Sequence, residues 1–149
     1  MSYNALRKGR FSENDREYFI TTVTHNRKPL FRSLECAQIC IKTFRDVAVE
    51  NKSQWLAWVL MPDHFHGLLL LGESQDISKV VGYAKGRSSK LINGVINHST
   101  RVWQPGFYDH ALRREEDRLV LARYIIANPL RKGLVERLCD YPYWDSVWL

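Results

Sequence analysis

The chain has 149 residues, of which 45% are hydrophobic and 26% charged, and its formal net charge is +6. This composition is typical of a globular protein and excludes wholesale disorder, and the length favours one domain over residues 1–149. No apolar run approaches the ~20 residues of a membrane-spanning helix, and no secretory signal is visible in the first ten residues. The three cysteines are interpreted as reduced thiols, so a cytoplasmic protein is expected.

The positive charge is concentrated in one segment. Between Ile77 and Arg114, seven basic residues stand against a single acidic residue, Asp109. Such a stretch is typical of a surface that binds a polyanion, although a solvated helix face has the same composition. A polar arm over about residues 1–17 adds further basic residues. The residues that we favour for contact with a nucleic acid are Arg7, Lys8, Arg10, Lys85, Arg87, Lys90 and Arg101.

The first half of the chain predicts a strand, a helix and a hairpin. Tyr18–His25 is rich in β-branched and aromatic residues, as strands are. Ser33 is a suitable N-cap for a helix that runs to about Glu50 with apolar residues at helical spacing. Two apolar segments follow, Trp55–Met61 and His64–Leu71, and only two residues separate them. So short a connection predicts an antiparallel hairpin.

The second half predicts two more helices. One runs from Ile77 to about Ile96 and is expected to be interrupted or loosened at its glycines, which are Gly82, Gly86 and Gly94. Residues 97–111 are predicted to form a loop or a short strand. The last helix is expected from about Glu115 or Glu116 to Ala127, with a stop at Pro129. The order of elements predicts an α+β fold, a ferredoxin-like antiparallel sheet with helices packed against it.

Two histidines mark a candidate metal site. His64 and His66 are separated by one residue on a predicted strand. Because side chains alternate between the faces of a strand, both imidazoles should point the same way. Paired imidazoles suit Mn²⁺, Zn²⁺ and related ions, and Mg²⁺ where oxygen ligands complete the shell. Two half-exposed histidines at the start of a strand are the alternative.

Tyr124 and Asn128 lie four residues apart on the last predicted helix. Positions i and i+4 share a face of a helix, so a phenol and a carboxamide would project together. If that face met the two histidines, Asn128 could serve as a third metal ligand. The alternatives are a core aromatic at Tyr124 and, at Asn128, a helix end set by the following Pro129.

Three stretches together resemble a known family. They are MPDHFHGLL (61–69), WQPGFYDHALR (103–113) and YIIANPLRKGLV (124–135), and the opening YFITTVTHNRKPLF (18–31) is also similar. The histidine pair with a downstream helical tyrosine resembles the HUH single-strand endonucleases. The longer stretches resemble the REP-associated tyrosine transposases, bacterial relatives of the single-tyrosine insertion-sequence transposases. The similarity covers nearly the whole chain in order.

The resemblance implies the HUH endonuclease fold and a metal-dependent transposase or endonuclease. Such an enzyme cleaves and rejoins single-stranded DNA near hairpin (REP-like) sequences through a 5′-phosphotyrosine. Tyr124 matches the nucleophile, and His64, His66 and Asn128 match the ligands of Mg²⁺ or Mn²⁺. The implied protein is bacterial and nucleoid-associated, binds single-stranded DNA and DNA hairpins, has no membrane partner, and acts as a homodimer or a monomer.

Several neighbouring residues have more than one interpretation. Trp103 could stack on unpaired DNA bases or pack in the core, and the same holds for Phe107 and Tyr108. Asp63 is favoured as a turn residue over a carboxylate that orients an imidazole. His110 could touch DNA, complete a polar network or be structural.

Two arginines and two other functions also stay open. Arg123 and Arg131 could stabilise a phenolate or a phosphate, or be surface charges. A hairpin-binding protein without chemistry would keep the basic segment but would not need the four site residues together. A zinc hydrolase would use the histidine pair but would want a third histidine or a carboxylate.

Overall fold

The computed structural model describes residues 16–113 and 117–149. Its strands are β1 (Glu17–Val23), β2 (Gln54–Met61), β3 (His64–Leu70), β4 (Tyr108–Ala111) and β5 (Trp144–Ser146). They form an antiparallel sheet in the order β4-β1-β3-β2-β5. The helices are α2 (Leu34–Glu50), α3 (Ile77–Ile96), α4 (Arg118–Ile126) and α5 (Asn128–Arg131). Up to β4 the element order is the βαββαβ of a ferredoxin-like fold, which confirms the predicted α+β class.

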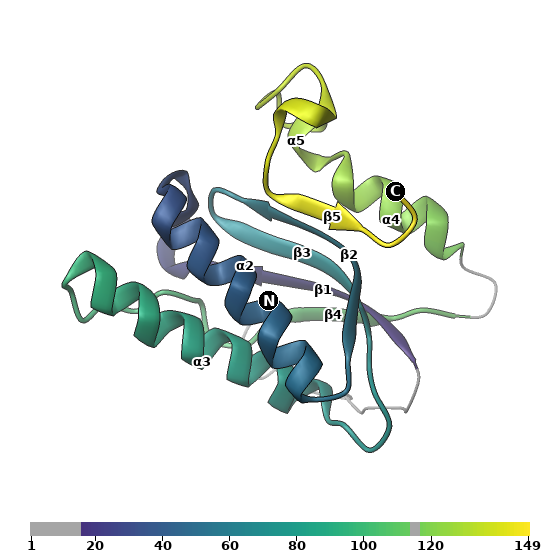
Figure 1. Cartoon of the computed structure of the whole chain (residues 1–149), viewed down its shortest axis with the longest axis horizontal. Coiled ribbons are helices and arrows are strands. Elements are labelled where there is room, and N and C mark those ends of the chain that lie inside the picture. The colour runs from purple at the N-terminus through teal and green to yellow at the C-terminus, as the bar shows by residue number, and fades with distance from the viewer. Residues whose placement is uncertain (1–15, 114–116) are drawn as a thin grey trace.

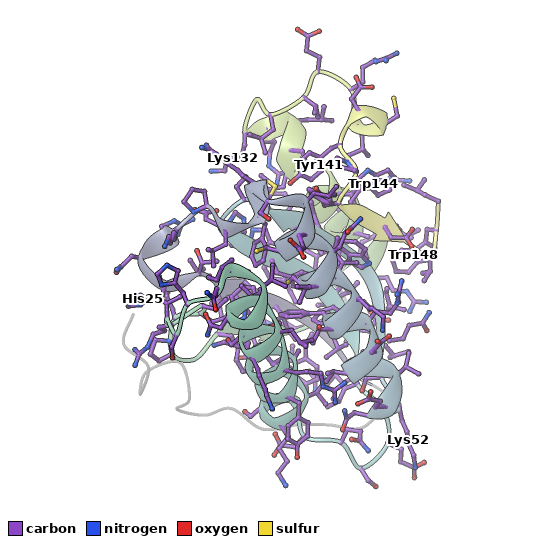
Figure 2. The ribbon with its side chains drawn as sticks, turned by 60° about the vertical axis from the view of Figure 1, so that its left-hand side comes forward. His25, Lys52, Lys132, Tyr141, Trp144 and Trp148 are labelled. Atoms are coloured by element: carbon purple, nitrogen blue, oxygen red, sulfur yellow. The ribbon has the colours of Figure 1, made fainter. Side chains whose placement is uncertain are left out.

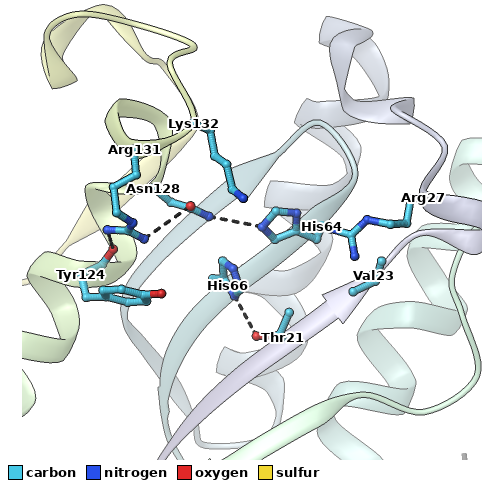
Figure 3. A pocket seen from close by; sticks show the side chains of 9 residues that line it. All are labelled: Thr21, Val23, Arg27, His64, His66, Tyr124, Asn128, Arg131 and Lys132. Carbon is cyan, nitrogen blue, oxygen red and sulfur yellow. Dashed lines mark hydrogen bonds between the residues drawn. The ribbon is translucent and has the colours of Figure 1, made fainter. Parts of the chain in front are cut away.

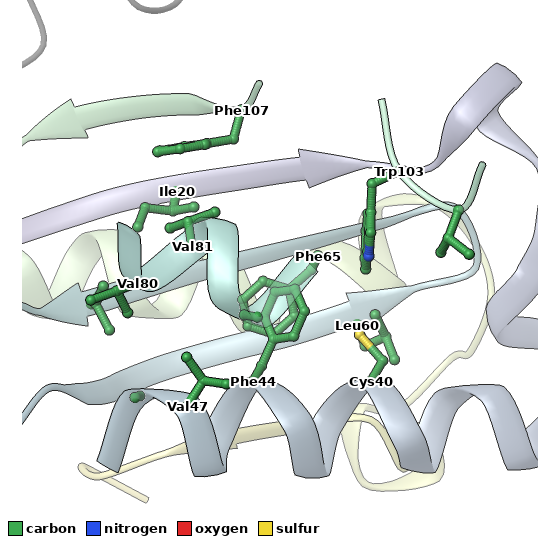
Figure 4. Packing of buried hydrophobic residues seen from close by; sticks show 14 of the residues in the cluster. Ile20, Cys40, Phe44, Val47, Leu60, Phe65, Val80, Val81, Trp103 and Phe107 are labelled. Atoms are coloured by element: carbon green, nitrogen blue, oxygen red, sulfur yellow. The ribbon is translucent and has the colours of Figure 1, made fainter. Parts of the chain in front are cut away.

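The sheet separates two layers of helices. α2 and α3 cover one face, and α4 lies on the other face beside β5 (Figure 1). On the first face, Phe44 of α2 and Val81 of α3 pack around Phe65 and Ile20 of the sheet (Figure 4). On the second face, a smaller cluster joins Ile125 of α4 to the sheet. No described helix is long and apolar enough to cross a membrane.

Alternation along two central strands decides which residues face α4. On β1, Ile20 and Thr22 are fully buried on the α2 and α3 side, and the residues that alternate with them, such as Thr21, face the other way. On β3, Phe65 belongs to the core under α2 and α3, whereas Leu68 belongs to the cluster under α4. The two-residue period of a strand therefore places His64 and His66 on the α4 face.

The C-terminal segment packs on that same face. Tyr141 and Trp144 lie against the cluster under α4 (Figure 2). The hydroxyl of Tyr141 donates to the carbonyl of Leu60 in β2. Burial, with Tyr143 nearby, raises the pKa of Tyr141 to about 12, so the hydroxyl stays protonated as a donor. This segment adds β5 beside β2 and extends the sheet beyond the predicted plan.

β1 ends two residues earlier than expected. Thr24 forms only an isolated bridge to Trp103, and a 3₁₀ turn begins at His25. Asn26 and Arg27 have φ of 56° and 51°, which is left-handed backbone that no strand can continue. The turn directs the following loop back toward the start of β3.

α3 is one continuous helix, so the interruption expected at its glycines is wrong. A Cβ built at Gly82, Gly86 or Gly94 would meet nothing within 4 Å. Buried residues such as Val81 and Ile92 hold the helix against the sheet and α2. Packing therefore outweighs the low helix propensity of glycine, which is about 1 kcal/mol per residue.

Helix α4 starts with a side-chain cap, Asp117, that was not predicted from the sequence. The Asp117 carboxylate accepts from the backbone N–H groups two and three residues further on, at 2.8 and 3.3 Å. The expected start at Glu115 or Glu116 lies outside the described residues. The predicted end at Ala127 is confirmed, since Ala127 is the C-cap of α4, and Pro129 lies in the first turn of the separate helix α5.

Gly67 of β3 provides a test of the packing. A Cβ at this position would lie 2.6 Å from Cε3 and Cζ3 of Trp55. We expect Gly67→Ala to lower the free energy of unfolding by about 1–3 kcal/mol, because the indole must move. The matched change Gly82→Ala, in open space on α3, should raise it by about 0.5–1 kcal/mol. Urea unfolding measures both, and a Gly67→Ala protein as stable as wild type would contradict this packing.

Candidate functional site

A cavity of about 420 Å³ opens on the α4 face of the sheet (Figure 3). We call it the histidine pocket. It brings together all four residues predicted to carry chemistry, which are His64, His66, Tyr124 and Asn128. Five further residues complete its lining: Thr21, Val23, Arg27, Arg131 and Lys132. The pocket therefore joins β1, β3, α4 and α5 with the turn after β1.

The two histidines lie side by side on β3, as predicted. Their ring centroids are 4.4 Å apart and their planes meet at 76°. His64 is buried, and His66 is partly buried between Thr21 of β1 and Val59 of β2. Phe19 stacks on the His66 ring at 5.7 Å. The neighbouring strands thus hold both rings in place.

Hydrogen bonds set the orientation of each imidazole. Nδ1 of His64 lies 2.6 Å from Oδ1 of Asp63, and Nδ1 of His66 lies 2.7 Å from Oγ1 of Thr21. Asp63 is thus the predicted turn residue and also the carboxylate that orients an imidazole. Its other oxygen, Oδ2, accepts from Nε of Arg27 at 3.1 Å. With Nδ1 occupied, Nε2 is the nitrogen that each ring can offer to a ligand.

The surroundings keep both rings neutral at pH 7. Burial lowers the pKa of His66 to about 3, and the positive charges of Arg131 and Arg27 act in the same direction. Burial also lowers the pKa of His64, although the adjacent Asp63 opposes the shift. A neutral imidazole keeps the lone pair that a metal ion requires.

These shifts predict how stability depends on pH in the metal-free protein. In the unfolded chain the His66 imidazole binds a proton near pH 6.5, whereas in the folded protein it does so only near pH 3, the value to which its pKa is lowered. The stabilising contribution of His66 is therefore complete above about pH 6.5 and is lost as the pH falls. Between pH 6.5 and 5, the free energy of unfolding should fall less steeply in His66→Gln than in wild type. Denaturant unfolding with a chelator measures this, with exposed His98→Gln as the control; equal slopes in all three proteins would contradict the shift.

Asn128 contacts the histidine pair directly. It is buried, with 3% of its surface exposed, and its Nδ2 lies 3.2 Å from Nε2 of His64. Its Oδ1 accepts from Arg131 at 3.4 Å. The carboxamide therefore sits against the nitrogen that could bind a metal. Asn128 therefore meets the condition under which it could serve as a third ligand, and that role stays a prediction.

Tyr124 lies at the rim of the pocket rather than in the core. Its side chain is 54% exposed, which makes the alternative of a core aromatic wrong. The Arg131 guanidinium lies 3.9 Å from the centroid of the phenol ring and also donates to the Tyr124 carbonyl at 2.7 Å. Arg131 thus fixes both Tyr124 and Asn128. His110 and Arg123 do not line the pocket.

The structure contradicts a base-stacking role for Trp103. Its side chain is 4% exposed and packs against Phe31 and Phe44, and its Nε1 donates to Ser88 at 3.0 Å. Phe107 is likewise part of the core, whereas Tyr108 is 46% exposed on β4. A loop rich in aromatics lies between two helices here, so the hydrophobic effect draws its large rings inward.

The basic residues of α3 lie across the sheet from the histidine pocket. Lys85 donates to the carbonyls of Gln104 and Gly106, and Arg87 forms a bidentate ion pair with Glu50 at 2.7 and 2.9 Å. These contacts give both side chains a role within the fold. DNA contact by Lys85, Arg87, Lys90 and Arg101 stays a prediction, and Arg7, Lys8 and Arg10 lie outside the described residues.

The pocket has its own positive charges, and two of the residues that carry them were not predicted from the sequence. Arg27 and Lys132 line it together with Arg131. Both stand inside the stretches that carry the family resemblance, but no spacing relates them to the histidines. They meet only because the turn after β1 and the end of α5 converge on the start of β3.

The donor set of the pocket suits a divalent cation that accepts oxygen ligands. It offers two neutral imidazoles and one carboxamide. Among the described residues, no group of three or more His, Cys, Asp or Glu side chains could hold a metal. A zinc site would want such a third ligand, whereas Mn²⁺ and Mg²⁺ bind carboxamide oxygens and waters.

A ferredoxin-like sheet with paired histidines on a central strand, facing a tyrosine on a neighbouring helix, is the arrangement of the HUH class of proteins. Residues 12–128 match the family described as "Transposase IS200 like". The chain belongs to this family, which confirms the resemblance seen in its motifs.

Individual relatives agree with this result. The chain is 28% identical over 137 residues to the "REP-associated tyrosine transposase" of Escherichia coli K12, covering 85% of this chain and 73% of the relative. It is similar to a solved REP-associated tyrosine transposase bound to a REP hairpin, with 26% identity and a TM-score of 0.75 over 91% of this chain and 79% of the other. The chain is also similar to the crystal structure of a protein described as a "putative transposase" from Deinococcus radiodurans. The two chains are 25% identical, with a TM-score of 0.58 over 80% of this chain and 95% of the other.

Proposed function

We propose that this transposase cleaves and rejoins single-stranded DNA near hairpin sequences, with Tyr124 as the nucleophile. The observation that carries the proposal is that Tyr124, His64, His66 and Asn128 line one pocket with three cationic side chains. A relative solved with a REP hairpin supports the same class of DNA substrate.

The residues would divide the work as follows. The Nε2 atoms of His64 and His66 would hold Mg²⁺ or Mn²⁺ together with the carboxamide oxygen of Asn128. That oxygen would have to turn toward the ion, because Asn128 now presents its Nδ2 to His64 and its Oδ1 to Arg131. When bound, the ion offsets the charge on a non-bridging phosphate oxygen. Arg27 and Lys132 attract the DNA backbone into the pocket. Arg131 keeps the phenol at the rim, where a phosphate can reach it.

The reaction exchanges one phosphate ester for another. The Tyr124 oxygen forms a bond to phosphorus as the bond from phosphorus to the 3′ oxygen breaks. The phenol loses its proton, and the leaving oxygen gains one and becomes a 3′-OH. Because the phosphotyrosine keeps an ester bond, a 3′-OH can later reverse the step without a nucleotide cofactor.

Two other functions are weaker on this structure. A protein that only binds hairpins would not need a tyrosine at the rim of a histidine pocket. A zinc hydrolase lacks its third histidine or carboxylate among the described residues. Neither alternative accounts for the position of Tyr124.

A covalent-trapping assay tests the proposal. Purified protein is mixed with single-stranded oligonucleotides, with and without hairpins from the flanks of its own gene, and with Mg²⁺, Mn²⁺ or Zn²⁺. The DNA is labelled at its 3′ end in one set and at its 5′ end in the other. A 5′-phosphotyrosine keeps only the 3′-end label on the protein in a denaturing gel.

Each outcome distinguishes among the functions. A 3′-labelled adduct with Mg²⁺ or Mn²⁺ supports the transposase chemistry. Tight hairpin binding without an adduct favours the binding protein, and cleavage by Zn²⁺ alone, without an adduct, favours the hydrolase. A 5′-labelled adduct would reverse the proposed polarity.

A further inference from the structure

A second cavity of about 380 Å³ adjoins the histidine pocket. The two cavities share Arg27, His64 and Lys132 in their linings. We call the second one the flanking groove. It runs beside the turn between β2 and β3, under the loop after β1 and the segment after α5. Its volume falls in the range of pockets for small molecules, about 300–1,000 Å³.

The charge of the flanking groove favours an anion. Arg27, Arg32 and Lys132 line it, and Asp63 is the only acidic residue in its lining. Asp63 is already engaged by His64 at 2.6 Å and by Arg27 at 3.1 Å. Within residues 16–113 and 117–149, neither Arg32 nor Lys132 forms an ion pair. Two positive charges therefore remain for a ligand.

The remaining wall is apolar. Pro29, Pro62 and Leu134 line it, and Leu134 is 44% exposed. A surface that combines unpaired cations with apolar side chains matches a nucleotide, whose phosphate is charged and whose base has apolar faces. A phosphate ion alone would not use the apolar wall.

The groove is held in shape by backbone hydrogen bonds. The Pro62 carbonyl accepts from the N–H of Phe31 at 3.0 Å, and the Asp63 carbonyl accepts from the N–H of Thr24 at 2.9 Å. These bonds tie the loop after β1 to the turn before β3. A preformed groove binds its ligand without first ordering a loop, which favours affinity.

We propose that the flanking groove binds one unpaired nucleotide adjacent to the phosphate in the histidine pocket. Its phosphate lies against Arg32 and Lys132, and its base or sugar lies against the wall of Pro29, Pro62 and Leu134. This inference rests on the proposed function, because it takes the cleaved strand as the ligand. It makes Arg32 a residue that binds substrate outside the reacting centre.

The test compares Arg32→Ala with Arg45→Ala. Arg45 is an exposed arginine of α2, on the opposite face of the sheet, so both variants lose one positive charge. Binding of single-stranded oligonucleotides is measured in the Tyr124→Phe background, where no adduct can form. We expect Arg32→Ala to raise Kd about tenfold and to reduce the slope of log K against log salt by about 0.7. Arg45→Ala should change neither.

The position of the nucleotide is tested with modified DNA. Oligonucleotides are cut back to the cleaved phosphate from the 5′ side or the 3′ side, or carry single abasic positions. When the DNA is cut back from the side that carries the bound nucleotide, Arg32→Ala and Arg45→Ala should bind it with the same Kd. An abasic position on that side should weaken wild-type binding. In proteins with Tyr124 intact, Arg32→Ala should raise KM for adduct formation and leave kcat unchanged.

Failure of this inference is distinguishable from failure of the proposed function. If wild type forms the adduct but the two arginine variants bind with equal Kd and equal salt slopes, the flanking groove does not hold a nucleotide. If wild type forms no adduct, the proposed function fails, while the Arg32 salt slope still reports whether DNA lies in the groove. Circular dichroism and thermal unfolding check that both variants are folded.

Discussion

Replacing Tyr124 by phenylalanine is expected to abolish the covalent adduct and strand cleavage, with a loss of rate of at least about 10⁴-fold. Losses of this size follow removal of a nucleophile in other enzymes. DNA affinity should stay within about twofold, because the exposed ring and its contact with Arg131 are kept. Trapping on denaturing gels measures the chemistry, and fluorescence anisotropy measures binding.

Tyr83→Phe is the matched control. Tyr83 lies on α3, is 52% exposed and lines neither cavity described above. Removing its hydroxyl should leave both cleavage and binding unchanged. If Tyr124→Phe still formed the adduct at the wild-type rate, the nucleophile would have to be another residue.

Replacing His66 by alanine is expected to lower the affinity for Mn²⁺ by at least about 100-fold. Loss of a residue that only supports a ligand already costs about 10–100-fold, so loss of the ligand should cost no less. Asp63→Asn should fall in that smaller range, because it weakens the hydrogen bond that orients His64. Titration calorimetry with Mn²⁺ and no DNA measures these affinities separately from activity.

His98→Ala provides the reference for this series. His98 is exposed and lies just after α3, outside both cavities. The His98→Ala protein should bind Mn²⁺ with the affinity of the wild type. Equal affinity in His66→Ala and His98→Ala would show that the histidine pair does not hold the ion, and the pocket would then serve DNA binding alone.

Local pattern was enough to predict most of the fold. The β-branched run from Tyr18, the Ser33 cap and the two apolar segments around Pro62 each predict their element from neighbouring residues alone. The same holds for the shared face of His64 and His66, because the period of a strand is two residues. Errors fell where long-range packing overrides local preference, as in α3, whose glycines do not break it.

Trp103 shows most clearly where local sequence is not enough to predict the position of a side chain. Its position in a basic, aromatic segment predicted DNA contact and core packing equally well. The difference depends on whether α2 and α3 close over the indole, and its partners Phe31 and Phe44 lie 72 and 59 residues away in the chain. No local pattern contains that information.

Short-range periodicity and contiguous motifs were enough to predict the class of fold, the shared face of the histidine pair and the family, and they also made Tyr124 the candidate nucleophile. Which cations face the site depends instead on contacts between segments that are distant in the chain. The basic residues of α3 lie across the sheet, whereas Arg27 and Lys132 meet at the histidines from opposite ends of the chain. A sheet separates its two faces completely, whereas loops from distant strands and helices converge at the ends of its strands.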